Sequence, residues 1–96
     1  MPADDSPARA EAAFLGLAIG DALGATSEFM TPAEIRSRYG VLRQIRGGGW
    51  LGLRPGQVTD DTEMSLALAR AVLACGGWSL PAIADALVAW MRSKPI

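Results

Sequence analysis

In the stretch PGQVTDDTEM, residues 55–64, a glycine-rich loop gives way to a helix that begins at about Asp60. Adjacent Asp60 and Asp61, flanked by the hydroxyls of Thr59 and Thr62, offer hard oxygen donors of the kind that Mg²⁺ and Mn²⁺ prefer. A structural interpretation competes, because Asp60 and Glu63 have the spacing of a capping box and acids stabilise the first turn of a helix. Capping leaves Asp61 and both threonines unexplained. The pattern alone therefore leaves a metal site and a helix cap both open.

Apolar residues at helical spacing predict four helices, at about residues 7–22, 32–39, 60–74 and 80–92. Ser6 and Ser79 are the expected N-caps of the first and the fourth. Thr31 and Glu34 form the expected capping box of the second. No run of alternating apolar residues predicts a strand, so the expected fold class is all-α.

Other residues are candidates for chemistry or close packing. Glu28 lies among apolar neighbours, where a carboxylate can act as acid or base, and a solvated surface position is the alternative. Asp21 interrupts the apolar face of the first helix, where it can bond the helix end or reach a ligand. The run Gly47-Gly48-Gly49 can turn backbone amides toward a phosphate, but no strand-loop-helix fingerprint accompanies it. A second set of glycines, Gly16, Gly20 and Gly24, predicts close approach of another helix or a ligand.

The composition of the 96 residues excludes several classes of function. A hydrophobic content of 50% argues for a folded domain, and the net charge of −1 gives no case for nucleic acid. The absence of histidine excludes imidazole ligands and a Ser-His-Asp triad within the chain. The single cysteine, Cys75, fits a reducing compartment and is expected to be a small buried residue. We expect a cytoplasmic protein without a transmembrane segment, since neither a secretory signal nor a membrane-spanning run is present.

Several motifs together resemble the ADP-ribosylglycohydrolase family. They are GLAIGDALGA at residues 16–25, Glu28-Phe29, and PGQVTDDTEM at residues 55–64, in this order. The resemblance covers nearly the whole chain after residue 10. Three more stretches are similar to members that act on the ADP-ribosylated nitrogenase iron protein: EFMT at 28–31, GGGWL at 47–51 and WMRSKP at 90–95.

The resemblance implies an orthogonal, all-α helical fold with two divalent cations, Mn²⁺ or Mg²⁺, in a central cleft. The implied activity is hydrolysis of ADP-ribose from an arginine of a protein substrate, with the nitrogenase iron protein as the expected target and a nitrogen-regulatory signalling protein as a candidate partner. The expected site residues are the metal ligands Thr59, Asp60 and Asp61, the catalytic candidates Glu28 and Asp61, and the substrate-binding candidates Asp21, Gly48 and Gly49.

The family's second Asp-rich motif has no counterpart in these residues. Two divalent ions bring four positive charges, against two negative charges from Asp60 and Asp61. We therefore expect residues 1–96 to be the N-terminal portion of a single domain and to be inactive alone. The alternative is a non-catalytic fragment that folds, or binds ADP-ribose or one metal ion.

Overall fold

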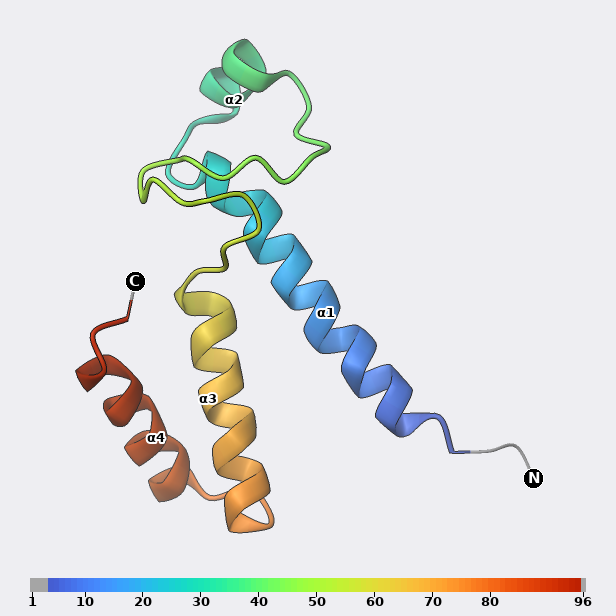
Figure 1. Cartoon of the computed structure of the whole chain (residues 1–96), viewed down its shortest axis with the longest axis vertical. Coiled ribbons are helices and arrows are strands. Elements are labelled where there is room, and N and C mark those ends of the chain that lie inside the picture. The colour runs from blue at the N-terminus through green and yellow to red at the C-terminus, as the bar shows by residue number, and fades with distance from the viewer. Residues whose placement is uncertain (1–3, 96) are drawn as a thin grey trace. The chain divides into compact units, whose positions relative to one another are not determined.

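The computed structural model describes residues 4–95 (Figure 1). In chain order the elements are α1 (Ser6–Gly24), the 3-10 helix η1 (Ala25–Ser27), α2 (Pro32–Tyr39), α3 (Asp60–Cys75) and α4 (Leu80–Arg92). Within residues 4–95 there is no strand, and the one isolated bridge joins Gly48 and Leu53. The all-α class is confirmed, and all four predicted helices are present with small changes at their ends.

The chain divides into two compact units, Met1–Val58 and Thr59–Ile96. The first contains α1, η1, α2 and the long loop that follows them. The second contains α3 and α4. None of the helices in the described residues is long and apolar enough to span a membrane.

The start of α1 corrects one prediction. Asp5 occupies the N-cap position without a side-chain capping bond, and Ser6 is the first helical residue rather than the cap. The Ser6 N–H instead donates to the Asp4 carboxylate at 2.9 Å. Hydrogen bonds from the side chain and backbone of Ser6 lower the pKa of Asp4. Pro7 follows in the first turn, where a missing N–H costs nothing.

The glycines of α1 face open space rather than a packed neighbour. A Cβ added at Gly16, Gly20 or Gly24 would meet no atom within 4 Å outside the helix itself. The close approach that this stripe predicts is therefore not seen among the described residues. Apolar side chains on the same helix are exposed too, with 54% of Leu15 and 56% of Ile19 accessible to solvent.

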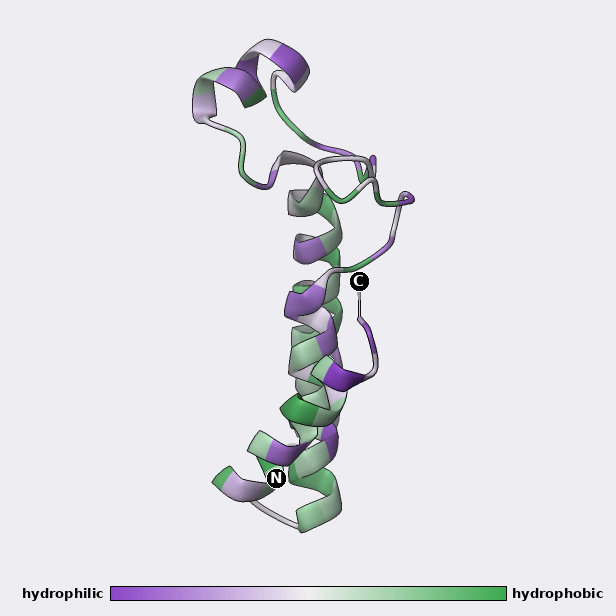
Figure 2. Cartoon of the chain, turned by 90° about the vertical axis from the view of Figure 1, so that its left-hand side faces the viewer, coloured by the Kyte–Doolittle hydropathy of each residue, from purple (hydrophilic) through white to green (hydrophobic). Residues whose placement is uncertain are grey.

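α2 is a short, polar helix with the predicted capping box. The Glu34 N–H donates to the Thr31 hydroxyl at 3.2 Å, and the Thr31 N–H donates to the Glu34 carboxylate at 3.4 Å. Gly40, at φ 70°, ends the helix in a conformation that glycine adopts without steric cost. Figure 2 shows α2 coloured mainly as hydrophilic.

The loop after α2 folds back on itself in two turns. In the first, Gly48 and Leu53 exchange backbone hydrogen bonds of 2.7 and 3.0 Å, and the Leu53 side chain is buried. In the second, the Gln57 N–H donates to the Arg54 carbonyl at 3.0 Å, with Gly56 at φ 88°. Proline followed by a glycine of positive φ is the pattern of a type II turn. The loop is therefore ordered by its own hydrogen bonds.

In the second unit, α3 and α4 pack side by side as a helical hairpin (Figure 1). Gly76 ends α3 in the left-handed conformation at φ 75°, and its N–H donates to the Val72 carbonyl. The Ser79 hydroxyl accepts from the Ala82 N–H at 3.3 Å, so the predicted cap of α4 is confirmed. Ile83 is the buried apolar residue of α4.

Cys75 corrects a second prediction, because it is exposed rather than buried. It is the last residue of α3, and Gly76 and Gly77 beside it are exposed as well. The end of a helix that runs into a glycine turn has no neighbouring surface to cover a small side chain. The burial that we predicted from the small, apolar side chain of Cys75 is therefore wrong.

Candidate active site

Glu28 lies in a tight turn directly after η1. The Met30 N–H donates to the Ser27 carbonyl at 3.0 Å, and Glu28 (φ −57°, ψ 135°) and Phe29 (φ 65°) occupy the two central positions. These angles match a type II turn, in which glycine normally takes the position of positive φ. A phenylalanine in this conformation costs about 1–2 kcal/mol, so other contacts must hold the turn.

Trp50 makes two such contacts. Its indole N–H donates to Oε2 of Glu28 at 2.9 Å. The ring of Phe29 packs edge-on against the indole, with centroids 5.1 Å apart and planes at 65°. An edge-to-face pair contributes about 0.5–1.5 kcal/mol beyond its buried area, which is comparable to the strain in the turn. Trp50 therefore fixes the Glu28 carboxylate and stabilises the strained residue next to it.

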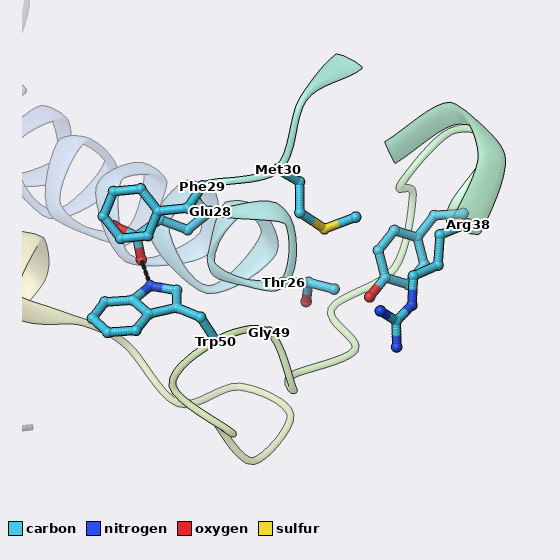
Figure 3. Close-up of a pocket in the computed structure, with 8 residues that line it drawn as sticks. Thr26, Glu28, Phe29, Met30, Arg38, Gly49 and Trp50 are labelled. Atoms are coloured by element: carbon cyan, nitrogen blue, oxygen red, sulfur yellow. Dashed lines mark hydrogen bonds between the residues drawn. The ribbon is translucent and has the colours of Figure 1, made fainter. Parts of the chain in front are cut away.

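The Glu28 side chain lines a cavity of about 320 Å³ in the first unit (Figure 3). In Figure 3, Glu28, Phe29 and Trp50 lie at one end, and Met30 extends toward the end where Arg38 lies. The volume is at the lower end of the range of small-molecule pockets, about 300–1,000 Å³. With a carboxylate at one end and a guanidinium at the other, the cavity suits a ligand that carries charges of both signs.

The glycine run Gly47–Gly49 holds Trp50 in place. The buried hydroxyl of Thr26 donates to the Gly47 carbonyl at 2.7 Å and so ties the loop to η1. A Cβ on Gly49 would lie 2.6 Å from the carbonyl oxygen of Ala25, and a Cβ on Gly47 would lie 2.5 Å from that of Leu53. Only glycine permits this close approach, and all three glycines also have positive φ.

The three predicted substrate-binding residues have different surroundings. Gly49 lines the cavity, whereas Gly48 and Asp21 are not part of its lining. The Gly48 N–H donates to the Leu53 carbonyl and the Gly48 carbonyl accepts from the Leu53 N–H, so this N–H cannot donate to a phosphate as expected without opening the hairpin. Asp21 is half-buried in the last turn of α1, and its carbonyl accepts from the Ala25 N–H. Their role toward a substrate stays a prediction.

In the second unit, the predicted metal ligands stand at the start of α3. Thr59 is the N-cap, and its hydroxyl accepts from the Asp61 N–H at 3.3 Å. Its side chain is only 3% exposed, whereas Asp60 and Asp61 are both exposed. The Ser65 hydroxyl donates to the Asp61 carbonyl at 2.7 Å one turn further on. The three predicted ligands are therefore presented together at one helix end.

The capping box expected from Asp60 and Glu63 is wrong. The cap is Thr59, which makes Asp60 the first helical residue. Glu63 lies one residue beyond the box position, and its carboxylate accepts from the Trp90 indole N–H of α4 at 3.3 Å. The cap explains Thr59, one of the three residues that the capping interpretation had left unexplained. It does not use the Asp60 carboxylate.

The donor chemistry of this helix start fits a hard divalent ion, but the set is incomplete. Two carboxylates and one hydroxyl are oxygen donors suited to Mg²⁺ or Mn²⁺. Within residues 4–95 there is no group of three histidine, cysteine, aspartate or glutamate side chains placed to hold a metal ion. Thr59, Asp60 and Asp61 could thus hold one side of an ion whose other ligands lie elsewhere.

Two contacts of the site lay outside the sequence prediction. Trp50 follows the glycine run in the GGGWL stretch, and its hydrogen bond to Glu28 spans twenty-two residues, which no local pattern predicts. Trp90 lies in the fourth predicted helix, and its hydrogen bond to Glu63 spans twenty-seven residues. A tryptophan within a glycine-rich, polar loop was the available signal, because a buried or packed indole usually finds an acceptor for its N–H.

Comparison with known proteins supports the family that the sequence motifs resemble. Residues 2–95 match the family model described as ADP-ribosylglycohydrolase. The chain is 57% identical over 88 residues to the ADP-ribosyl-[dinitrogen reductase] glycohydrolase of Rhodospirillum rubrum. This alignment covers 92% of the chain and 30% of that protein. It is 37% identical over 92 residues to the ADP-ribosylarginine hydrolase Tri1 of Serratia proteamaculans, covering 96% of the chain and 24% of the relative. The corresponding hydrolase of Pseudomonas putida is 45% identical over 84 residues, covering 88% of the chain and 21% of the relative. The chain thus spans less than a third of the length of these curated relatives.

Proposed function

The chain belongs to the ADP-ribosylglycohydrolase family, and from this premise we propose that it provides part of a hydrolase that removes ADP-ribose from an ADP-ribosylated arginine of a target protein. The names of the relatives support arginine as the linkage, since two of them are called ADP-ribosylarginine hydrolases. The identity of 57% to the Rhodospirillum rubrum protein supports the nitrogenase iron protein, dinitrogen reductase, as the target.

The hydrogen bond between Trp50 and Glu28 is the observation that carries the catalytic part of this proposal. It holds a half-buried carboxylate at the edge of a cavity large enough for part of a nucleotide or an arginine side chain. One hydrogen bond to Oε2 leaves the carboxylate able to take a proton from a water or to orient it. Glu28 is thus our candidate for the general base, and Asp61 is the other candidate.

Metal binding is a separate part of the proposal. Thr59, Asp60 and Asp61 would hold Mn²⁺ or Mg²⁺ through oxygen atoms. When bound, such ions supply Lewis acidity toward ribose hydroxyls and water. The pair of aspartates contributes two negative charges, so two ions require further carboxylates to balance their four positive charges. The protein's own contribution at this point is a rigid helix start that keeps the two carboxylates adjacent.

The direct test is hydrolysis of ADP-ribosylarginine, in the presence of Mn²⁺, by the complete hydrolase of which these residues are proposed to form a part. We expect Glu28→Gln to lower kcat by at least about 100-fold, the lower range for loss of a general base, with the circular dichroism spectrum unchanged. Glu11→Gln is the matched control, because Glu11 is an exposed carboxylate on α1. Unchanged turnover in Glu28→Gln would remove Glu28 from the mechanism.

A second candidate function is a non-catalytic chain that binds ADP-ribose. It is favoured by the lack of a three-ligand metal cluster within residues 4–95. Equilibrium binding of ADP-ribose without any release of arginine from ADP-ribosylarginine would support this second function against the first.

A further inference from the structure

Positive charge is concentrated in one segment of the chain. The whole sequence has a net charge of −1, yet the residues between Glu34 and Asp60 contain five arginines and no acid. All of this segment up to Val58 lies in the first unit. The fold itself does not require this concentration of arginines, because capping and packing stabilise its helices.

Two of these arginines lie against Tyr39, the last residue of α2, and a third lines a small cavity with one of them. The Cζ atoms of Arg38 and Arg46 lie over the ring of Tyr39, at 5.7 and 5.0 Å from its centroid. Arg43 and Arg46 line a small, polar cavity of about 150 Å³ in the following loop. All three arginines are exposed. We call Arg38, Arg43 and Arg46 the arginine surface.

The acids closest to the arginine surface in sequence have other partners. Glu34 accepts from the Thr31 N–H in the capping box of α2. The Glu28 carboxylate accepts from the Trp50 indole at 2.9 Å. A cation–π contact with Tyr39 does not use up the five N–H donors of a guanidinium group, so both arginines can still donate to carboxylates. The arginine surface is therefore suited to pair with acids from another molecule.

We propose that the arginine surface docks an acidic face of the protein substrate. The inference rests on the proposed function in one respect, because it takes the partner to be the ADP-ribosylated protein. A guanidinium pairs with a carboxylate through two parallel hydrogen bonds, and opposite charges accelerate encounter between proteins. The cavity beside Arg43 is too small for a nucleotide, and the two stacked arginines are spread around a ring rather than aimed at one point. The net negative charge of the chain argues against a nucleic-acid partner.

The test compares the Arg43→Glu/Arg46→Glu variant with wild type, both in the complete hydrolase of which these residues are proposed to form a part. The two substrates are free ADP-ribosylarginine and ADP-ribosylated dinitrogen reductase. We expect kcat/KM for the protein substrate to fall at least about tenfold in low salt, and its dependence on ionic strength to flatten. Hydrolysis of free ADP-ribosylarginine should stay within about twofold of wild type. The control variant Arg9→Glu/Arg92→Glu makes the same change in net charge on exposed positions of α1 and α4, and should behave as wild type.

Binding of ADP-ribosylated dinitrogen reductase, measured by biolayer interferometry over a salt series, gives a readout that needs no turnover. The milder Arg43→Gln/Arg46→Gln variant should lose part of the affinity while keeping its circular dichroism spectrum. Equal loss on both substrates would assign these arginines to the nucleotide instead, and unchanged protein binding would remove the docking surface. Retention of a labelled RNA by wild type but not by the variant would replace the acidic protein with nucleic acid. If wild type fails to hydrolyse free ADP-ribosylarginine, the proposed function fails while the binding series still decides the docking surface.

Discussion

The indole N–H of Trp50 donates a 2.9 Å hydrogen bond to the carboxylate of Glu28, so one glycine-rich loop sets the position of an acid on a different segment of the chain. Three features support this bond: the Thr26 hydroxyl that anchors the loop, the close backbone approach at Gly49, and the edge contact of Phe29. Changes in the loop should therefore affect Glu28 without touching it directly.

Replacing Trp50 by phenylalanine keeps an aromatic ring against Phe29 and removes the N–H donor. A hydrogen bond to a charged group contributes about 1.5–3 kcal/mol when protected and less at a half-exposed site. In the complete hydrolase, we expect kcat for ADP-ribosylarginine to fall about 3- to 10-fold, with KM nearly unchanged and little change in Tm. The control is Trp78→Phe, because Trp78 is a 70% exposed indole in the second unit. An equal loss in both variants would point to a general effect of losing an indole.

Gly49→Ala should destabilise the first unit strongly. The new Cβ would lie 2.6 Å from the carbonyl oxygen of Ala25, at a backbone φ of 71° that alanine rarely adopts. Backbone atoms must shift to relieve this contact, so we expect a loss of about 2–4 kcal/mol in the free energy of unfolding, the size of severe core changes. Urea denaturation followed by Trp fluorescence measures it.

Gly52→Ala is the matched control for that change. Gly52 lies in the same hairpin at φ 63°, but a Cβ there has no atom within 4 Å. Only the conformational penalty of about 1–2 kcal/mol should remain. Equal destabilisation in the two variants would show that the close approach of η1 adds nothing to the free-energy cost of replacing Gly49 by alanine.

The helices could be predicted from the sequence because their signals are local. Thr31 with Glu34, and Ser79 before α4, each reach a partner within three residues. The start of α3 shows the limit of such signals, because Thr59 and Asp60 are both good caps and only the backbone conformation decides between them. Trp50 with Glu28 could not be predicted, since no rule of spacing joins residues twenty-two positions apart. The predicted burial of Cys75 was wrong for a related reason, because burial depends on which surface faces the helix end.

Thr59→Ala tests whether the threonine is a cap, a metal ligand or both. In the presence of EDTA, loss of the bond to the Asp61 N–H should cost about 0.5–2 kcal/mol of stability, as for other N-caps. Thr59→Ser keeps the hydroxyl and should recover most of this. If Thr59 also binds metal, Mn²⁺ should stabilise wild type and the serine variant more than the alanine variant. An identical shift with Mn²⁺ in all three would leave Thr59 as a cap alone.

Asp61→Asn tests the helix start as one side of a metal site. The amide keeps the shape of the side chain but removes one of the two negative charges that Asp60 and Asp61 contribute. In isothermal titration of the 96-residue chain with Mn²⁺, we expect wild type to bind one ion with a dissociation constant of about 10⁻⁴ to 10⁻³ M, as for sites with few charged ligands. The variant should bind about tenfold more weakly or not at all, and its circular dichroism spectrum should not change.

Asp85→Asn is the control for that titration, because Asp85 is an exposed acid on α4 outside the first turn of α3. It makes the same change in net charge, so equal weakening in both variants would mean that Mn²⁺ responds to overall charge rather than to a site. Tight binding of two ions by wild type would contradict the charge argument itself. Two carboxylates balance only half of four positive charges, and uncompensated charge in a partly desolvated site is costly. One weakly held ion, lost in Asp61→Asn and kept in Asp85→Asn, is the result that assigns Asp60 and Asp61 to one side of a larger metal centre.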